Sequence, residues 1–131
     1  ILEFNRLIKT LNGLSKDEFL VELAKNFNVE KLFVAEKPTK EHQITMCVEG
    51  AWYRLTCNSD IINESHPVKC LDAEILTDFV LKPILGIQDL KTDTNIEFIS
   101  GKRELNSIQK KIELEEFKIG FKQQTSLQHK M

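Results

Sequence analysis

Polar side chains alternate along the segment Asp89–Asn95, which reads aspartate, lysine, aspartate and asparagine at every second position. Calcium loops begin in this way, but they also need glycine at the sixth position and a bidentate glutamate at the twelfth. The chain has Thr94 and Ser100 at those two positions. We therefore expect Asp89 and Asp93 to cap a loop through Asx-type hydrogen bonds rather than to bind calcium.

Other metal ligands do not fall into a recognisable pattern. His42, Glu64 and His66 could be imagined around a metal ion, but their spacing matches no known class of site. The cysteines are odd in number and share no CxxC spacing, so we expect neither a zinc site nor a disulfide framework; they are Cys47, Cys57 and Cys70. The sequence thus predicts no metal site and no cofactor.

Catalysis by acids and bases needs a titratable side chain whose pKa is shifted in a cleft beside a partner. Asp72 is the strongest acidic candidate, yet its place before an apolar helical pattern is explained by N-capping of that helix. The chain contains no P-loop, no Rossmann glycine pattern and no serine, histidine and aspartate in triad order. We assign no catalytic residue.

The composition is that of an ordinary globular domain. The 131 residues are 41% hydrophobic and 29% charged, and their length suits a single domain, 1–131. A net charge of −2 gives no bulk attraction to nucleic acid or to anionic lipid, although Gly101–Met131 is locally basic, with seven basic and four acidic residues. We expect no nucleic-acid partner, no membrane contact and a reducing cytoplasm, since no signal-type segment is present.

The elements that must position these residues begin with a predicted helical hairpin over residues 1–28. Its first helix is indicated by apolar residues at helical spacing, and Asn12-Gly13 should end that helix because glycine reaches the left-handed conformation without strain. Ser15 and Glu18 have the spacing of a capping box, which predicts a second helix through Phe27. The first stripe consists of Ile1, Phe4, Leu7, Ile8 and Leu11.

An antiparallel β-hairpin is predicted over Gln43–Thr56, with a two-residue turn at Glu49-Gly50 where glycine supplies the positive φ that such turns need. Opposed residues in this register share one side of the sheet. One face is then apolar and the other mostly polar, which supports the register. The apolar pairs are Val48 with Ala51, Met46 with Tyr53 and Ile44 with Leu55.

Trp52 is the one prominent apolar side chain on the polar face of this hairpin, where it lies between Cys47 and Arg54. Either a second layer covers this face, or the face makes contact with a partner. Exposed tryptophan beside arginine is typical of interaction hot spots. We expect Trp52 to be partly exposed, and we take Trp52 and Arg54 as the candidate interface.

The second half of the chain reads as a helix, a strand, a helix and a strand. Asp72 should cap a helix that runs through Leu81, because Pro83 disfavours helical geometry at the preceding residue. A strand over Asn95–Ile99 and a final strand around Phe117, Ile119 and Phe121 flank a helix marked by Leu105, Ile108 and Ile112. Residues 29–131 thus predict an α+β fold. We expect a mixed sheet, with a right-handed parallel strand–helix–strand unit beside the hairpin and helices mainly on one face.

The stretch Leu71–Lys110 also carries a resemblance, because it combines Leu-Asp before a helix, a Pro-x-Leu-Gly-Ile signature, and a strand that ends in glycine. The chain resembles the C-terminal part of a bacterial and archaeal domain-of-unknown-function family, number one thousand and fifteen, often labelled SpoOJ or ParB-like regulators. The resemblance extends over Thr39–Met131 and more loosely over the first thirty or so residues. Its motif residues are Leu71, Asp72, Pro83, Gly86, Asp89, Thr92 and Gly101.

The resemblance implies that the chain is a fragment of a longer protein, since family members extend beyond it at both ends. For this fragment we expect a non-catalytic structural or interaction domain, whose partners are the remaining domains or a second copy in a homodimer. The family implies two alternatives. A serine-kinase-like phosphotransferase linked to serine metabolism would need a metal-binding acid and a phosphate cradle. A DNA-associated partition regulator would need a basic recognition helix, where this chain has Glu18 and Glu22.

Overall fold

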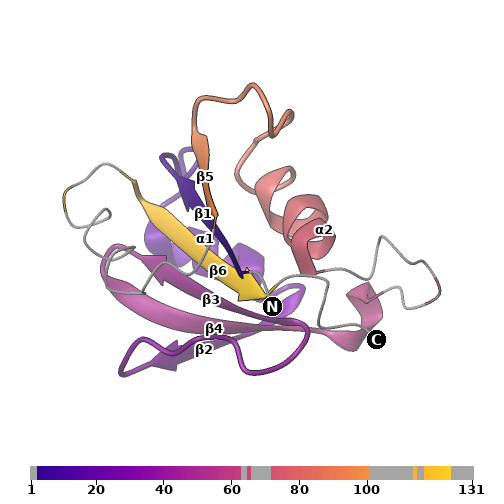
Figure 1. Ribbon diagram of the computed structural model, residues 1–131. Helices are drawn as coiled ribbons and strands as arrows, with labels where there is room; N and C mark the ends of the chain where they lie inside the picture. The colour runs from indigo at the N-terminus through magenta and orange to yellow at the C-terminus, as the bar shows by residue number, and fades with distance from the viewer. Residues whose placement is uncertain (1–2, 63–64, 66–71, 101–113, 115–116, 125–131) are drawn as a thin grey trace.

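The computed structural model describes residues 3–62, 65, 72–100, 114 and 117–124 (Figure 1). It has an α+β fold in which six strands form one sheet and short helices pack against it. The strands are β1 (Glu3–Ile8), β2 (Phe27–Leu32), β3 (Gln43–Val48), β4 (Ala51–Cys57), β5 (Ile96–Ser100) and β6 (Ile119–Gln124). The helices are α1 (Lys16–Leu23), η1 (Ser59–Ile61), α2 (Asp72–Leu76) and η2 (Thr77–Leu81).

The strand order is β2-β4-β3-β6-β1-β5, and every described pair of neighbours is antiparallel. The mixed sheet with a parallel neighbouring pair is therefore wrong for the described strands. β5 and β6 do run in the same direction, because both are antiparallel to β1, but β1 lies between them. The insertion of β1 is visible in Figure 1, where β5, β1 and β6 lie side by side.

The helical hairpin predicted for residues 1–28 is wrong in its first half. Glu3–Ile8 is strand β1, which pairs with β5 on one side and β6 on the other. The second helix is correct from its cap onward: Ser15 Oγ accepts from the Glu18 amide at 3.1 Å, and the Ser15 amide donates to Glu18 Oε1 at 2.9 Å. That helix ends at Leu23, and Phe27 begins strand β2.

The β3–β4 hairpin has the predicted register throughout. Val48 opposes Ala51, Met46 opposes Tyr53, and Ile44 opposes Leu55. Glu49 and Gly50 both have positive φ, 50° and 83°, which is the geometry of the turn that joins two strands by two residues.

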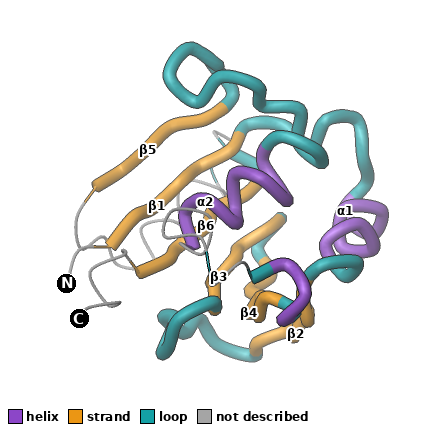
Figure 2. The backbone as a smooth tube through the Cα atoms, turned by 90° about the vertical axis from the view of Figure 1, so that its right-hand side faces the viewer, coloured by secondary structure: helices purple, strands orange, loops and turns teal. Residues whose placement is uncertain are grey.

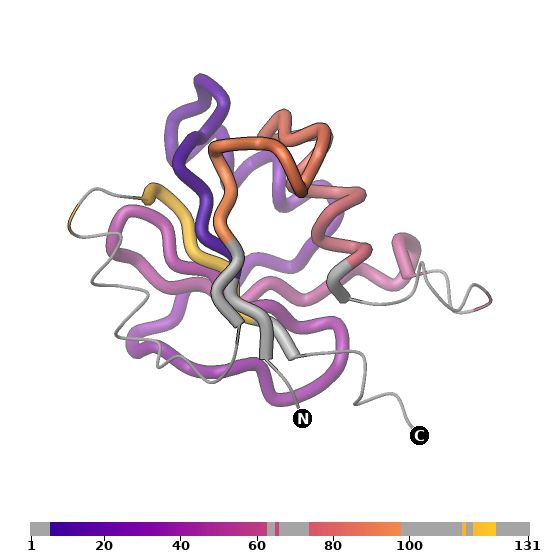
Figure 3. Tube along the Cα trace, turned by 45° about the horizontal axis from the view of Figure 1, so that its top comes forward, coloured from indigo at the N-terminus to yellow at the C-terminus, as the bar shows by residue number. Residues whose placement is uncertain are grey.

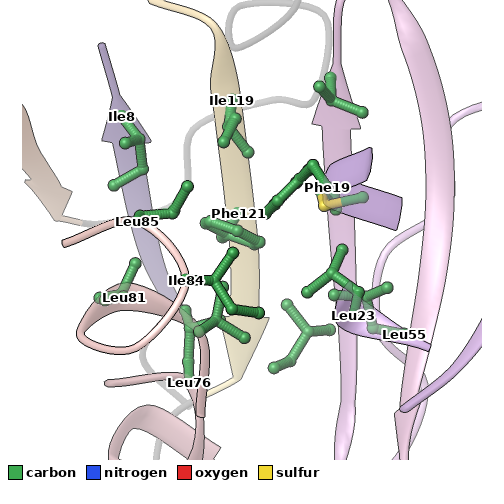
Figure 4. Close-up of a cluster of buried hydrophobic side chains, with 14 of the residues drawn as sticks. Ile8, Phe19, Leu23, Leu55, Leu76, Leu81, Ile84, Leu85, Ile119 and Phe121 are labelled. Carbon is green, nitrogen blue, oxygen red and sulfur yellow. The ribbon is translucent and has the colours of Figure 1, made fainter. Parts of the chain in front are cut away.

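The main core lies on one face of the sheet and is covered by helices from two places in the chain (Figure 2). α1 packs beside the β2–β4–β3 half, and α2 with η2 packs beside the β6–β1 half. Phe121 of β6 lies between the two coverings, with Phe19 and Leu23 of α1 on one side and Leu81 of η2 on the other (Figure 4). The expectation of helices on one face is thus confirmed for the described elements.

The helix that begins at Asp72 ends at Leu81, as predicted, but its second half is wider than an α-helix. The Lys82 amide donates to the Thr77 carbonyl, five residues back, at 3.1 Å. Pro83 explains this turn, because its ring would clash with the carbonyl four residues back in a regular α-helix and it has no N–H to donate. The chain then turns at Gly86 and crosses to β5 (Figure 3).

Candidate functional site

Trp52 lies on the predicted face of the hairpin, opposite Cys47 and Leu32, but it is only 6% exposed. The expectation of a partly exposed tryptophan is therefore wrong. Trp52 belongs to a second, smaller hydrophobic cluster on the face of the sheet opposite the main core. The cluster draws on β1, β2, β3, β4 and the residue two before β6; its members are Leu7, Leu32, Cys47, Trp52 and Phe117.

Arg54, the other residue of the candidate interface, is held by two carboxylates. Its Nη1 lies 3.3 Å from Glu30 Oε1 on β2, and its Nη2 lies 2.6 Å from Glu36 Oε1 in the connection between β2 and β3. Thr45 Oγ1 donates to the backbone carbonyl of Glu36 at 2.5 Å. These contacts tie the 33–42 connection to the second face of the sheet, so Arg54 helps to position that segment.

The surface next to Trp52 contains a shallow groove of about 370 Å³ at the end of β2 and the tip of the β3–β4 hairpin. Leu32, Ala51 and Trp52 supply its apolar wall, and Lys31 and Gly50 complete its lining together with Phe33. Phe33 is fully exposed, and the neighbouring Val34 is 63% exposed. Sequence reasoning did not identify Phe33 and Val34. The signal in the sequence was a Phe-Val pair that directly follows Leu32, the last residue of β2, and precedes a polar connection.

A buried cation lies under the other face of the sheet. Arg6 of β1 is 7% exposed, and its Nη1 donates to Thr77 Oγ1 of η2 at 3.3 Å. Burial lowers the pKa of Arg6 to about 10, because the interior solvates a guanidinium poorly, and the carboxylate of Glu74 acts in the opposite direction. Sequence reasoning missed Arg6 as well, because the segment that contains it was taken for a helix.

Gly86, a glycine of the motif noted from the sequence, lies where two turns meet. Gly86 has a φ of 73°, and a Cβ added to it would lie 3.2 Å from the side-chain amide atoms of Asn12. Asn12 itself has a φ of 56°, and its Nδ2 donates to the carbonyl of Ile84 at 3.0 Å. The turn after Pro83 is thus joined to the turn between β1 and α1. This explains Gly86 by close packing and backbone geometry.

The predicted Asx capping is present in the loop before β5. Asp89 Oδ1 accepts from the Lys91 amide at 2.9 Å, and Asp93 Oδ1 accepts from the Asn95 amide at 2.8 Å. Thr92 lies in the same loop, where its amide donates to the Asp89 carbonyl at 3.3 Å. Both carboxylates therefore have structural roles.

Several predicted residues lie outside the part of the chain that the structure describes. They are Leu71, Gly101, Glu64, His66, Cys70 and the helix marked by Leu105, Ile108 and Ile112. Asp72 is the first residue of α2, but its side chain, and so its capping role, is likewise not described.

Within residues 3–62, 65, 72–100, 114 and 117–124, no three histidine, cysteine, aspartate or glutamate side chains gather as a metal site. Cys47 and Cys57 are both buried. Each helix in this part of the chain is too short or too polar to cross a bilayer.

A family model described as "Protein of unknown function (DUF1015)" matches residues 1–74. The matched residues include β1, α1 and the whole β2–β4 region with its groove, whereas the motif noted from the sequence lies mostly after residue 71. No curated protein and no solved structure matches the chain. Since the match extends over more than half of the 131 residues, the chain belongs to the DUF1015 family of proteins of unknown function.

Proposed function

We propose that this chain is a non-catalytic structural and interaction domain of a longer, cytoplasmic protein of the SpoOJ/ParB-like type. The observation that carries the proposal is the surface at the end of β2. There, Phe33 and Val34 are exposed beside a groove whose wall is made by Leu32, Ala51 and Trp52. Clusters of exposed apolar side chains beside a groove mark protein-interaction sites.

The acidic side chains whose contacts the structure describes support the same proposal, because several of them hold other parts of the fold. The carboxylates of Asp89 and Asp93 cap backbone amides. Glu30 and Glu36 hold Arg54, and Glu18 closes a helix cap. A catalytic acid or base would instead lie in a cleft within hydrogen-bond reach of the proton that it transfers.

Two alternative functions, a serine-kinase-like phosphotransferase and a DNA-associated partition regulator, have less support from the described residues. A serine-kinase-like phosphotransferase needs a metal-binding acid, and the described residues contain no cluster of metal-ligand type. A DNA-associated partition regulator needs a basic recognition helix, but the first turn of α1 carries Asp17 and Glu18, and its last turn has no basic residue.

Hydrogen exchange tests the proposal. We expect amides in the peptide Phe27–Val34 to exchange more slowly when the chain is part of the longer protein or an assembly than in the isolated 131-residue monomer. The α1 peptide Lys16–Leu23, which does not line the groove, is the internal control. Equal exchange of Phe27–Val34 in both settings would contradict an interaction role for this surface.

A second measurement tests the non-catalytic part of the proposal. The longer protein is assayed for turnover of ATP or ADP with serine, before and after Asp72→Asn. We expect this substitution to leave any such turnover unchanged, because asparagine is as good an N-cap as aspartate. Loss of turnover at unchanged stability would make Asp72 a functional residue and would contradict the proposal.

A further inference from the structure

We infer that the surface at the end of β2 binds the same surface of a second copy of this chain. This surface, called the β2 edge surface below, consists of Lys31, Leu32, Phe33, Ala51 and Trp52. The inference rests on the proposed interaction function and names its partner.

In the described sheet β2 is an outer strand, which pairs with β4 on one side only. The backbone N–H and C=O groups on the other side of such a strand are a template for a further strand. A partner that adds to this edge would therefore gain main-chain hydrogen bonds as well as apolar contacts.

The β2 edge surface carries both a projecting side chain and a groove. Phe33 is fully exposed and forms one rim of the groove of about 370 Å³ that Leu32, Ala51 and Trp52 also line. A two-fold interface places the same patch of both subunits together, so each Phe33 can enter the groove of the other copy. An unrelated peptide could fill the groove, but it would need a further feature to cover Phe33.

The charges along β2 decide the register in which it can pair with β2 of a second copy. A two-fold axis perpendicular to the sheet makes one residue of β2 oppose its own copy, and opposed residues lie on the same face. An axis at Glu30 or at Lys31 would oppose like charges, which is unfavourable. An axis at Leu32 opposes Leu32 to Leu32 and Lys31 to Phe33 of the second copy, so each aromatic ring meets an ammonium group and a groove wall.

Self-association of the 131-residue chain is measured by sedimentation equilibrium over a range of micromolar concentrations. We expect a concentration-dependent dimer, and we expect Phe33→Asp to weaken dimerisation by roughly tenfold or more, as for a buried aromatic anchor. Because Phe33 is fully exposed, this substitution should leave the fold intact, which the thermal unfolding midpoint checks.

Val21→Asp is the matched control, since it makes the same kind of change at an apolar residue that is 62% exposed on α1. α1 precedes β2 and joins its Phe27 end, whereas the groove is at the Leu32 end, so the control should dimerise like the wild type. Equal weakening by both substitutions would overturn the inference, because it would show a general effect of added charge.

Disulfide trapping tests the register. We expect Leu32→Cys to give a covalent dimer under mild oxidation, because the axis places the two Cβ atoms within reach of a disulfide. Asn28→Cys is the control: it lies on the same face of the same strand but far from the axis. Trapping through Asn28 but not through Leu32 in a folded dimer would overturn the proposed register.

The outcomes separate this inference from the proposed function. If the wild type stays monomeric while Phe27–Val34 is protected in the longer protein, a different segment covers the β2 edge surface and only the inference fails. If Phe27–Val34 is unprotected and the chain is monomeric, both fail. A dimer that Phe33→Asp dissociates supports both.

Discussion

Arg6 places a charged group between a central strand and the helix that covers it. Its side chain is 7% exposed and reaches Thr77 of η2, while the carboxylate of Glu74 stabilises its charge from nearby. The guanidinium remains protonated at neutral pH, because burial lowers its pKa only to about 10. The cost of burying this charge is therefore fully present at neutral pH.

This cost predicts a pH effect on stability. Below about pH 10 the group is protonated in both states, but between about pH 10 and the ordinary, higher pKa of arginine the unfolded chain binds more protons than the folded one. The stability of the wild type should therefore rise with pH in this window. Relative to Arg6→Met, we expect the free energy of unfolding to increase by about 1 kcal/mol between roughly pH 9 and 11, measured by urea unfolding.

The comparison with Arg6→Met isolates the contribution of Arg6, because every other side chain is common to both proteins. Methionine keeps an unbranched stem of similar packing without the charge. A difference in stability that is constant or falls with pH would contradict the lowered pKa of Arg6.

Trp52 is only 6% exposed and packs in a cluster with Leu7 and Phe117. We expect its fluorescence to be blue-shifted and poorly quenched by acrylamide in the monomer. Trp52→Ala should lower the free energy of unfolding by about 3 to 5 kcal/mol, as for other large core aromatics. Phe33→Ala, at a fully exposed aromatic, is the control and should change it by less than about 0.5 kcal/mol.

At the scale of elements, the contact between the Asn12-Gly13 turn and the turn at Gly86 joins the two halves of the chain. Gly13 and Gly86 both have positive φ, but an added Cβ meets no described atom within 4 Å at Gly13 and meets Asn12 at 3.2 Å at Gly86. Alanine at Gly13 should cost about 1 to 2 kcal/mol from backbone strain alone. We expect alanine at Gly86 to cost more, measured by urea unfolding.

Asn12→Gly provides the matching background, because glycine accepts the φ of 56° at this position while removing the side chain. In the Asn12→Gly variant, Gly86→Ala should lower the free energy of unfolding by no more than Gly13→Ala does. If Gly86→Ala still costs more, the origin of the difference is not the contact with Asn12. The substitution alone should cost about 1 kcal/mol through loss of the hydrogen bond to Ile84.

The elements that sequence reasoning identified correctly are those with a local signal. The β3–β4 hairpin combines alternation with a glycine turn, and α1 begins with a capping box. β1 has no such signal, because Leu7 and Ile8 are consecutive and both fully buried, one on each face of the sheet. A strand buried on both faces lacks alternation, so its apolar residues matched a helical stripe equally well.

The exposure of Trp52 could not be predicted for a related reason. The hairpin register correctly gave its face, but Leu7, Leu32 and Phe117 reach that face from strands and a connection distant in sequence. Neighbouring strands in this sheet are mostly not consecutive in the chain. The sequence therefore indicates which residues share a face on one hairpin, but not what covers that face.

At the scale of the whole molecule, the sheet has its main core on one face and a smaller cluster on the other, and its two outer strands are β2 and β5. The apolar surface beside β2 thus lies at an outer strand of the described sheet, where a partner can reach it. Its charges are mixed, because Lys31 is exposed there while Glu30 pairs with Arg54.

We predict from the balance of its charges that this chain does not bind duplex DNA. Its net charge is −2, and α1 has Asp17 and Glu18 in its first turn and no basic residue in its last. Binding without sequence preference depends on phosphate contacts by lysine and arginine, so it should be weak and strongly salt-dependent. We expect no binding in the micromolar range when fluorescence anisotropy is measured at about 150 mM salt.

A variant with Glu18→Lys and Glu22→Lys is the sensitivity control, and it should bind more tightly than the wild type at low salt. Micromolar binding by the wild type at about 150 mM salt would show that the basic Gly101–Met131 segment, with its seven basic residues, is a nucleic-acid contact after all.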